Sequence, residues 1–339
     1  MSESARFTPS LGGPGLRASQ GGNVAALRAA FRRRLFDPLS DPLAGHPGGA
    51  GGPGPVVAPG AHDALSARLA AGAGAEALYM TGFGVAGSLL GAPDIGLVTA
   101  TEMADRVRAM AMAAGPVPLI ADGDNGHGGP ANVARLVRLY EGAGAACVQI
   151  EDQVLPKRCG HMAGKDVVPR AEAVARVRAA VGARASADFL VMARTDARGP
   201  LGLPEALARG EAFLAAGADL LFVEAPRSPA EMAEIARAFP GVPLVANLVE
   251  DGQTPWAPPA ELGEMGYRLV LYPVSGLLAA AAALARVYED VVARGIPPAG
   301  PRLSFADYND RLGLADYLAR DADLSGGAPQ GDEGGPESP

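Results

Sequence analysis

The stretch AGAACVQI (143–150) is one of four similar segments in which a glycine is followed by a short apolar run. The other three are AGAEALYM (73–80), AGADLLFV (216–223) and MGYRLVLY (265–272). Between them lie runs that follow a proline: GPVVAP (54–59), VPLIAD (117–122) and VPLVAN (242–247). Unbroken apolar runs of this length are typical of parallel strands buried on both faces. The alternation therefore predicts a repeated strand-containing unit.

Eight such runs are present, and stretches with helical spacing separate them. The expected strands are 55–60, 77–82, 118–123, 147–152, 189–195, 220–225, 243–248 and 269–273. The clearest helical stretches are 100–115, 132–144, 204–217 and 229–239. Alternating strands and helices indicate right-handed parallel crossovers, and eight units predict an α/β fold, the (β/α)₈ TIM barrel. A doubly wound open sheet is the alternative, but no G-x-G-x-x-G follows the first run.

The composition changes along the chain and suggests four regions. Residues 1–54 hold a helical stretch (23–36), which caps the fold or packs on a neighbour, and a Gly/Pro-rich linker. Residues 55–290 form the barrel, and residues 291–324 form a C-terminal helical arm. Residues 325–339, rich in Gly and Pro, are expected to be a disordered tail.

Several classes of protein are disfavoured by the bulk composition. The 339 residues carry a net charge of −8 with dispersed basic residues, which argues against a nucleic-acid partner. No apolar run is long enough to span a membrane, and the first residues lack a signal pattern. With only two cysteines, a disulfide framework is excluded and a cytoplasmic location is expected.

Charged and amide side chains gather at the carboxyl ends of the expected strands. These positions are Asp122, Asp124, Glu151, Asp152, Arg194, Asp196, Glu224 and Asn247. In a (β/α)₈ barrel the chemistry lies at this rim. Several carboxylates in one mouth repel one another and need a cation, so the hard oxygens of Asp122, Asp124 and Glu151 predict Mg²⁺, with Mn²⁺ as an alternative. Asp124 could instead cap the following helix.

The histidines and cysteines differ in their surroundings. His62 precedes Asp63, which is expected to cap a helix, and His127 lies in the glycine-rich turn DGDNGHGG (122–129). Cys147 starts an apolar strand and is expected to be buried. Cys159 instead lies in the polar stretch PKRCGHMAGK (156–165), whose cations would stabilise its thiolate.

Taken together, these motifs resemble one enzyme family. K-R-C-G-H (157–161), D-x-D (122–124), E-D (151–152) and A-R-T-D (193–196) are similar to those of the isocitrate lyase / phosphoenolpyruvate mutase superfamily. The likeness runs from about 56 to 317. It is strongest to the short-chain branch, which includes methylisocitrate lyase, 2,3-dimethylmalate lyase and carboxyphosphonoenolpyruvate mutase.

The resemblance implies a site and an assembly. It implies a Mg²⁺ site at Asp122, Asp124 and Glu151, and a mobile gating loop over 153–165. It also implies a helical arm, about 276–322, whose last barrel helix is exchanged with a neighbouring subunit in a homo-oligomer, a dimer of dimers. The residues implied for the substrate and its metal shell are Tyr79, Thr81, Gly82, Phe83, Asp94, Gly160, Arg194, Glu224 and Asn247.

The implied reaction is cleavage of a C–C bond in a 2-hydroxy di- or tricarboxylate. Arg194 would bind a carboxylate, Cys159 would protonate the leaving carbanion, and Lys157 and His161 would orient it. Tyr79 is a candidate base for the hydroxyl proton. C–P bond formation, as in the phosphonate-forming mutases, is the alternative suggested by Asp122-Gly123-Asp124 and by LYPVSG (271–276). A barrel that binds an acidic ligand without turnover would need a broken site.

Two residues depart from the branch. Phe83 stands where a small residue is commoner, which would narrow the pocket. His127 stands where lyases more often have an aromatic or similar residue. Both changes bear on the substrate and leave the metal site and the barrel untouched.

Overall fold

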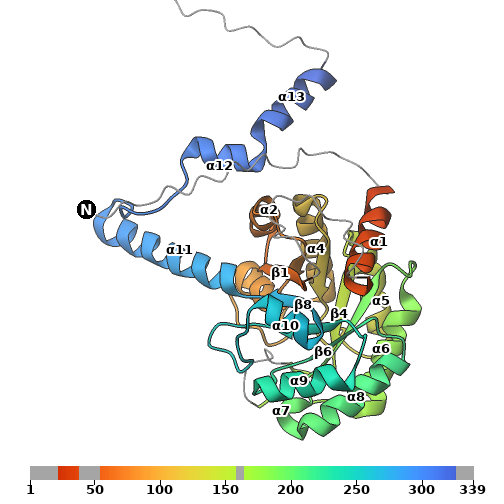
Figure 1. The fold of residues 1–339 in the computed structure, drawn as a ribbon. Helices are drawn as coiled ribbons and strands as arrows, with labels where there is room; N and C mark the ends of the chain where they lie inside the picture. The colour runs from red at the N-terminus through yellow and green to blue at the C-terminus, as the bar shows by residue number, and fades with distance from the viewer. Residues whose placement is uncertain (1–21, 38–53, 158–163, 326–339) are drawn as a thin grey trace, which may run out of the picture.

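The computed structural model describes residues 22–37, 54–157 and 164–325 of the chain. Eight strands form a closed barrel in sequence order, and every adjacent pair is parallel (Figure 1). The strands are β1 (Val56–Ala61), β2 (Leu78–Met80), β3 (Leu119–Asp122), β4 (Cys147–Glu151), β5 (Leu190–Thr195), β6 (Leu220–Val223), β7 (Leu244–Asn247) and β8 (Tyr267–Tyr272). The predicted (β/α)₈ barrel is confirmed, and the open sheet is excluded.

Helices follow the strands and surround the barrel. They are α2 (Ala64–Gly72), α3 (Gly82–Val85), α4 (Ala100–Ala114), α5 (Pro130–Ala143), α6 (Arg170–Ala183), α7 (Arg198–Leu201), α8 (Leu203–Ala215), α9 (Pro229–Ala238) and α10 (Pro259–Met265). A π-helical turn, η1 (Ala86–Leu90), extends α3. Two large apolar clusters fill the space between strands and helices.

The glycines of the repeated segment have a definite conformational role. Gly74, Gly144, Gly217 and Gly266 have φ values of 89°, 103°, 99° and 114°. Side chains with a Cβ rarely adopt these values, so glycine is favoured where each helix ends and the chain turns into the next strand. The sequence repeat therefore reflects the turn from helix to strand that recurs around the barrel.

The first helix, α1 (Gly22–Phe36), closes the amino-terminal end of the barrel. Phe31 and Leu35 are buried in one cluster with residues from the barrel interior, among them Cys147. Arg28 donates hydrogen bonds from Nε to the Ala145 carbonyl at 2.9 Å and from Nη2 to the Glu141 carbonyl at 2.6 Å. Of the two expected roles for this helix, capping is the one observed, and Cys147 is buried as expected.

The C-terminal helices project from the barrel. They are α11 (Ser275–Arg294), α12 (Phe305–Leu312) and α13 (Leu314–Leu324), and none has a buried residue in the described chain. Figure 1 shows α11 extending away from the strands, with α12 and α13 beyond it. The expected boundary between residues 290 and 291 falls inside α11, which runs from Ser275 to Arg294. Residues 326–339, expected to be disordered, lie outside the described residues.

Two local expectations can be checked against the helix ends. Asp63 is the N-cap of α2 and forms a capping box with Ser66, as expected. Asp124 does not cap α5, whose N-cap is Gly129 without a side-chain bond.

Within the described residues, no helix has both the length and the apolar character needed to cross a bilayer.

Candidate active site

A cavity of about 180 Å³ opens at the carboxyl ends of the strands. Its polar side is built from residues that lie far apart in the sequence and come from β2 through β7 and the loops that follow. Ten of the residues expected for the site line it: Tyr79, Thr81, Phe83, Asp94, Asp122, Glu151, Lys157, Arg194, Glu224 and Asn247. Closure of the barrel thus brings together side chains from strand ends and from loops that lie far apart in the sequence.

Asp122, the last residue of β3, is buried and held by hydrogen bonds. Its Oδ2 accepts from the Gly82 N–H at 3.1 Å, and its Oδ1 accepts from the Asp124 N–H and from Gln149 Nε2, each at 3.1 Å. Burial raises the pKa of Asp122, and the nearby Asp124 charge raises it further. Asp124 has a φ of 49°, in the left-handed region. The three hydrogen bonds fix the direction of the Asp122 carboxylate, and the backbone of Asp124 adopts a conformation that costs conformational energy.

Lys157 joins two of the rim acids. Its Nζ lies 2.5 Å from Asp94 Oδ1 and 2.5 Å from Asp124 Oδ1, and all three side chains are buried. Burial alone would lower the pKa of Lys157, but Asp124, Asp122 and Asp94 raise it well above its usual range. For Asp124, burial works toward a higher pKa, but the Lys157 and His127 charges outweigh it and the pKa is lowered. The ammonium is thus engaged by acids in this structure.

Arg194, on β5, is enclosed by three carboxylates. Its Nε and Nη2 donate to Asp196 at 2.9 and 3.1 Å. Nη2 also lies 3.0 Å from Glu224, and Nη1 lies 3.5 Å from Glu151. Glu224 in turn accepts from Asn247 Nδ2 at 3.3 Å. These bonds hold the guanidinium at the cavity wall, where it can meet an anionic ligand.

Tyr79 is held as a neutral phenol. Its hydroxyl donates to Gln149 Oε1 at 3.0 Å, and Gln149 connects it to Asp122. Burial, and then the Asp122 charge, raise the pKa of Tyr79 well above its ordinary value. A phenol with this pKa is a hydrogen-bond donor at neutral pH, which disfavours the suggested role of Tyr79 as a base.

A second part of the cavity lining was not anticipated from the sequence. It is mostly apolar and comes from the segments after β7 and β8 and the start of α11, with Val249, Pro273, Val274 and Leu278. Glu250 lies in this part of the lining, accepts from Ser275 Oγ through Oε1, and leaves Oε2 buried without a partner. These lining residues belong to no sequence motif, so nothing in the sequence indicated that they belong to the site. Gln149, in contrast, carries a signal, because it is a polar residue inside an apolar strand.

The donor chemistry of the acidic side fits a hard divalent cation. Four buried carboxylates, those of Asp94, Asp122, Asp124 and Glu151, face the single ammonium of Lys157. Glu151 Oε1 is buried without a hydrogen-bond partner, and burial raises the pKa of this carboxyl well above its usual range. Within the described residues, no three His, Cys, Asp or Glu side chains converge as a direct ligand set. The arrangement suits Mg²⁺, which keeps several waters and uses few direct protein ligands.

The remaining expected residues fall into three groups. Gly82 and Thr81 begin α3, where Thr81 accepts from the Gly84 N–H as N-cap. His127 is half-buried with a φ of 55° and does not line the cavity. Cys159, Gly160 and His161 lie outside the described residues, so their expected roles stay predictions.

Comparisons with known proteins identify the family of the chain. A family model described as phosphoenolpyruvate phosphomutase matches residues 50–292. The 2,3-dimethylmalate lyase of Eubacterium barkeri is 46% identical over 263 residues, which is 76% of this chain and 90% of the relative. The 2-methylisocitrate lyase of Aeropyrum pernix is 41% identical over 272 residues, which is 80% of this chain and 87% of the relative.

Solved structures show the same fold. A crystal structure of 2,3-dimethylmalate lyase matches with a TM-score of 0.81 at 38% identity, covering 92% of this chain and 99% of the other. A phosphonopyruvate hydrolase solved with oxalate and Mg²⁺ matches with a TM-score of 0.71 at 28% identity, covering 88% and 98%. The chain belongs to the phosphoenolpyruvate mutase/isocitrate lyase superfamily, a group of lyases and phosphonomutases, as its motifs had indicated.

Proposed function

We propose that this protein is a Mg²⁺-dependent lyase that cleaves a C–C bond of a 2-hydroxy di- or tricarboxylate, methylisocitrate- or dimethylmalate-like, to give pyruvate or glyoxylate. The observation that carries the proposal is the mixed lining of the cavity. Carboxylates lie there with Lys157 and Arg194, and the apolar side chains of Phe83, Val249 and Leu278 line the same cavity. An apolar lining suits an alkyl-branched substrate, so a dimethylmalate-like compound fits best. The identity to 2,3-dimethylmalate lyase supports the same choice.

Each polar residue would have a defined task. Asp122, Asp124 and Glu151 would hold Mg²⁺, which when bound supplies Lewis-acid polarisation of the substrate oxygens. Arg194 would bind a substrate carboxylate through its planar guanidinium. Tyr79, kept protonated by its raised pKa, would hold Gln149 in place and, through Gln149, the Asp122 carboxylate. The apolar lining would exclude water from the fragment that leaves as a carbanion.

That carbanion needs a proton. Cys159 follows Lys157 by two residues, and Lys157 is anchored at the cavity rim. We assign Cys159 as the proton donor, with Gly160 and His161 orienting it. The proton of the substrate hydroxyl requires a separate acceptor, and the raised pKa of Tyr79 disfavours that residue for the task.

A substrate panel tests the proposal. Purified protein would be given 2,3-dimethylmalate, methylisocitrate and isocitrate with Mg²⁺, and release of pyruvate or glyoxylate would be measured. We expect turnover of at least one compound, abolished by EDTA and restored by Mg²⁺ or Mn²⁺. Failure to release either product from any of the three would refute the lyase assignment.

C–P bond formation is a second candidate. The matching family model is that of phosphoenolpyruvate phosphomutase, and Asp122-Gly123-Asp124 supports the same chemistry. Phosphorus NMR on phosphoenolpyruvate and carboxyphosphonoenolpyruvate would show a new phosphonate or phosphinate signal under turnover. A spectrum without that signal, beside a positive lyase assay, would decide between the two candidates.

A further inference from the structure

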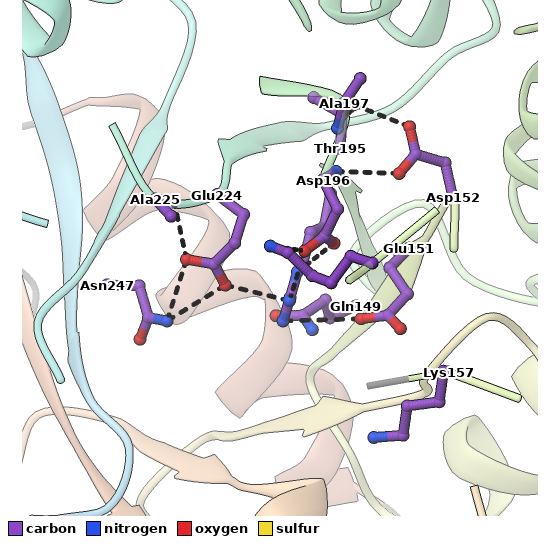
Figure 2. Close-up of polar contacts among 12 residues, drawn as sticks. Gln149, Glu151, Asp152, Lys157, Thr195, Asp196, Ala197, Glu224, Ala225 and Asn247 are labelled. Atoms are coloured by element: carbon purple, nitrogen blue, oxygen red, sulfur yellow. Dashed lines mark hydrogen bonds and ion pairs between the residues drawn. The ribbon is translucent and has the colours of Figure 1, made fainter. Parts of the chain in front are cut away.

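Asp196 belongs to a buried ionic network and does not line the cavity; Figure 2 shows it beside Thr195 and Asp152. It follows β5, is fully buried, and receives the two hydrogen bonds from Arg194 already described. Lys165 reaches it from the loop before α6, with Nζ 2.6 Å from Asp196 Oδ1. The Lys165 side chain is 7% exposed, so this ion pair lies away from bulk water.

Asp196 is also held by contacts that do not involve Lys165. Its N–H donates to Asp152 Oδ1 at 2.8 Å, and Thr195 Oγ1 donates to Asp152 Oδ2 at 2.7 Å. Asp152 is itself paired with Arg209 Nη1 at 3.0 Å. The backbone around Asp196 is therefore fixed from the other side. Loss of Lys165 would change the charge near Asp196 more than its place.

The charge balance around Arg194 gives Lys165 its role. The guanidinium faces three carboxylates, those of Asp196, Glu224 and Glu151. Glu151 would share its charge with the bound Mg²⁺, which leaves Asp196 and Glu224 against the one positive charge of Arg194. With both of these uncompensated, the local field would weaken the attraction of Arg194 for an incoming carboxylate. Lys165 supplies a second positive charge on the side of Asp196, at a distance where a weakly screened pair interacts strongly. Arg194 then keeps attraction for a ligand anion.

We infer that Lys165 is a positioning residue: by neutralising Asp196, it leaves the charge of Arg194 available to bind the substrate carboxylate. This inference rests on the proposed role of Arg194 as a carboxylate-binding residue. It extends the site by a residue that does not line the cavity. Because Arg194 would bind substrate before and during the reaction alike, Lys165 should affect binding more than turnover.

Oxalate is a suitable probe, because its binding does not require turnover and a superfamily structure contains it with Mg²⁺. Oxalate binding to Mg²⁺-loaded protein would be measured by calorimetry for wild type, Lys165→Met, Lys165→Arg, Asp196→Asn and the Lys165→Met/Asp196→Asn double variant. We expect Lys165→Met to raise the oxalate Kd about tenfold, and Lys165→Arg to stay within about threefold of wild type. In the Asp196→Asn background, adding Lys165→Met should change the Kd by less than about twofold.

Arg178→Met is the matched control. Arg178 is exposed on α6, the helix that follows Lys165, so its removal deletes one positive charge outside the contacts described for Asp196. Its oxalate Kd should equal that of wild type. If lyase activity is present, Lys165→Met should raise KM about tenfold with kcat within about threefold.

Three results would overturn the inference. The first is a Lys165→Met protein that binds oxalate as wild type does. The second is an equal loss from Lys165→Met with and without Asp196. The third is wild-type protein that fails to bind oxalate with Mg²⁺, which would remove Arg194 as the carboxylate site. If Asp196→Asn does not fold, the oxalate Kd values of Lys165→Met and Lys165→Arg decide the inference. If Lys165→Met does not fold, Lys165→Gln is used in its place. Absence of lyase turnover would refute the proposed reaction while the oxalate measurement still stands.

Discussion

At the scale of single residues, the proton donor can be tested directly. Replacing Cys159 with Ser removes an acidic thiol and leaves a hydroxyl of much higher pKa. We expect turnover to fall by about 10²-fold, the usual contribution of a general acid, while oxalate binding is retained. Cys147→Ser is the matched control for thiol loss, because Cys147 is buried at the start of β4. An unchanged rate for Cys159→Ser would remove this residue from the mechanism.

Asp94 gives the metal-free protein a defined pH dependence. Burial is the main cause that raises its pKa to about 6, against the opposing charge of Lys157. A raised pKa means that the folded state binds the proton more tightly than the unfolded state. Protonated Asp94 therefore stabilises the folded state fully below the pKa of the unfolded chain, about 4, and this stabilisation is lost as the pH rises through about 6.

The test compares the free energy of unfolding of wild type and Asp94→Asn in EDTA between pH 4 and 7.5. Wild type should lose on the order of 1–3 kcal/mol relative to the variant over this range. Asp105→Asn, at an exposed site on α4, should show no such difference. Parallel pH curves for wild type and Asp94→Asn would contradict the prediction.

At the scale of elements, the start of α3 lies against the acidic rim. A Cβ on Gly82 would lie 2.9 Å from Asp122 Oδ2 and 3.2 Å from Asp124 Oδ1, so alanine would push both carboxylates aside. We expect Gly82→Ala to weaken Mg²⁺ binding by about tenfold or more, as displaced ligand shells commonly do. Titration calorimetry with Mg²⁺ would measure it. Gly87→Ala, at a position with no neighbouring atom within 4 Å, should bind Mg²⁺ as wild type does.

The helix α1 stabilises the barrel from the end opposite the active site. Phe31 is 1% exposed, and its truncation to alanine should lower the free energy of unfolding by about 3–5 kcal/mol. The folded fraction should keep its kcat, because the cavity lies at the other end of the strands. Denaturant unfolding together with activity assays would check both parts. Arg33→Ala, on the exposed side of α1, should leave both unchanged.

At the scale of the whole molecule, the helical arm presents apolar side chains to solvent. Val292 is 86% exposed and Phe305 is 85% exposed, and Tyr288 and Leu318 are also exposed. Apolar patches of this kind mark interaction surfaces. We propose that a second copy of the chain covers them, in the homo-oligomer with exchanged helices that the family resemblance implies.

Val292→Asp should therefore reduce the oligomer mass, because it places a charge in the proposed contact. Light scattering coupled to size-exclusion chromatography would measure the mass of wild type and variant. Glu289→Gln, in the same helix, serves as the control and should leave the mass unchanged. A monomeric wild-type protein would contradict the proposal.

The barrel was predictable because its information is local. Glycine turns such as Gly144 and apolar runs such as 147–150 specify where each helix ends and each strand begins. The helix before β4 was expected at 132–144 and is found at Pro130–Ala143, an error of two residues at its start. Asp124 showed the limit of local reasoning. An acid before a helix is a normal N-cap, but here the close Lys157 ammonium engages it instead.

The sequence by itself determined the eight strand-containing units and the polar chemistry at the rim, because apolar periodicity and strand-end residues can be identified without distances. The choice between a closed barrel and an open sheet came from the structure. Tertiary structure alone decided which charges meet. Lys165 and Asp196 are 31 residues apart and share one buried ion pair, while Glu250 and Leu278 line one cavity with Phe83. Ion pairing and cavity shape depend on distances across loops, and those distances exist only after the barrel closes.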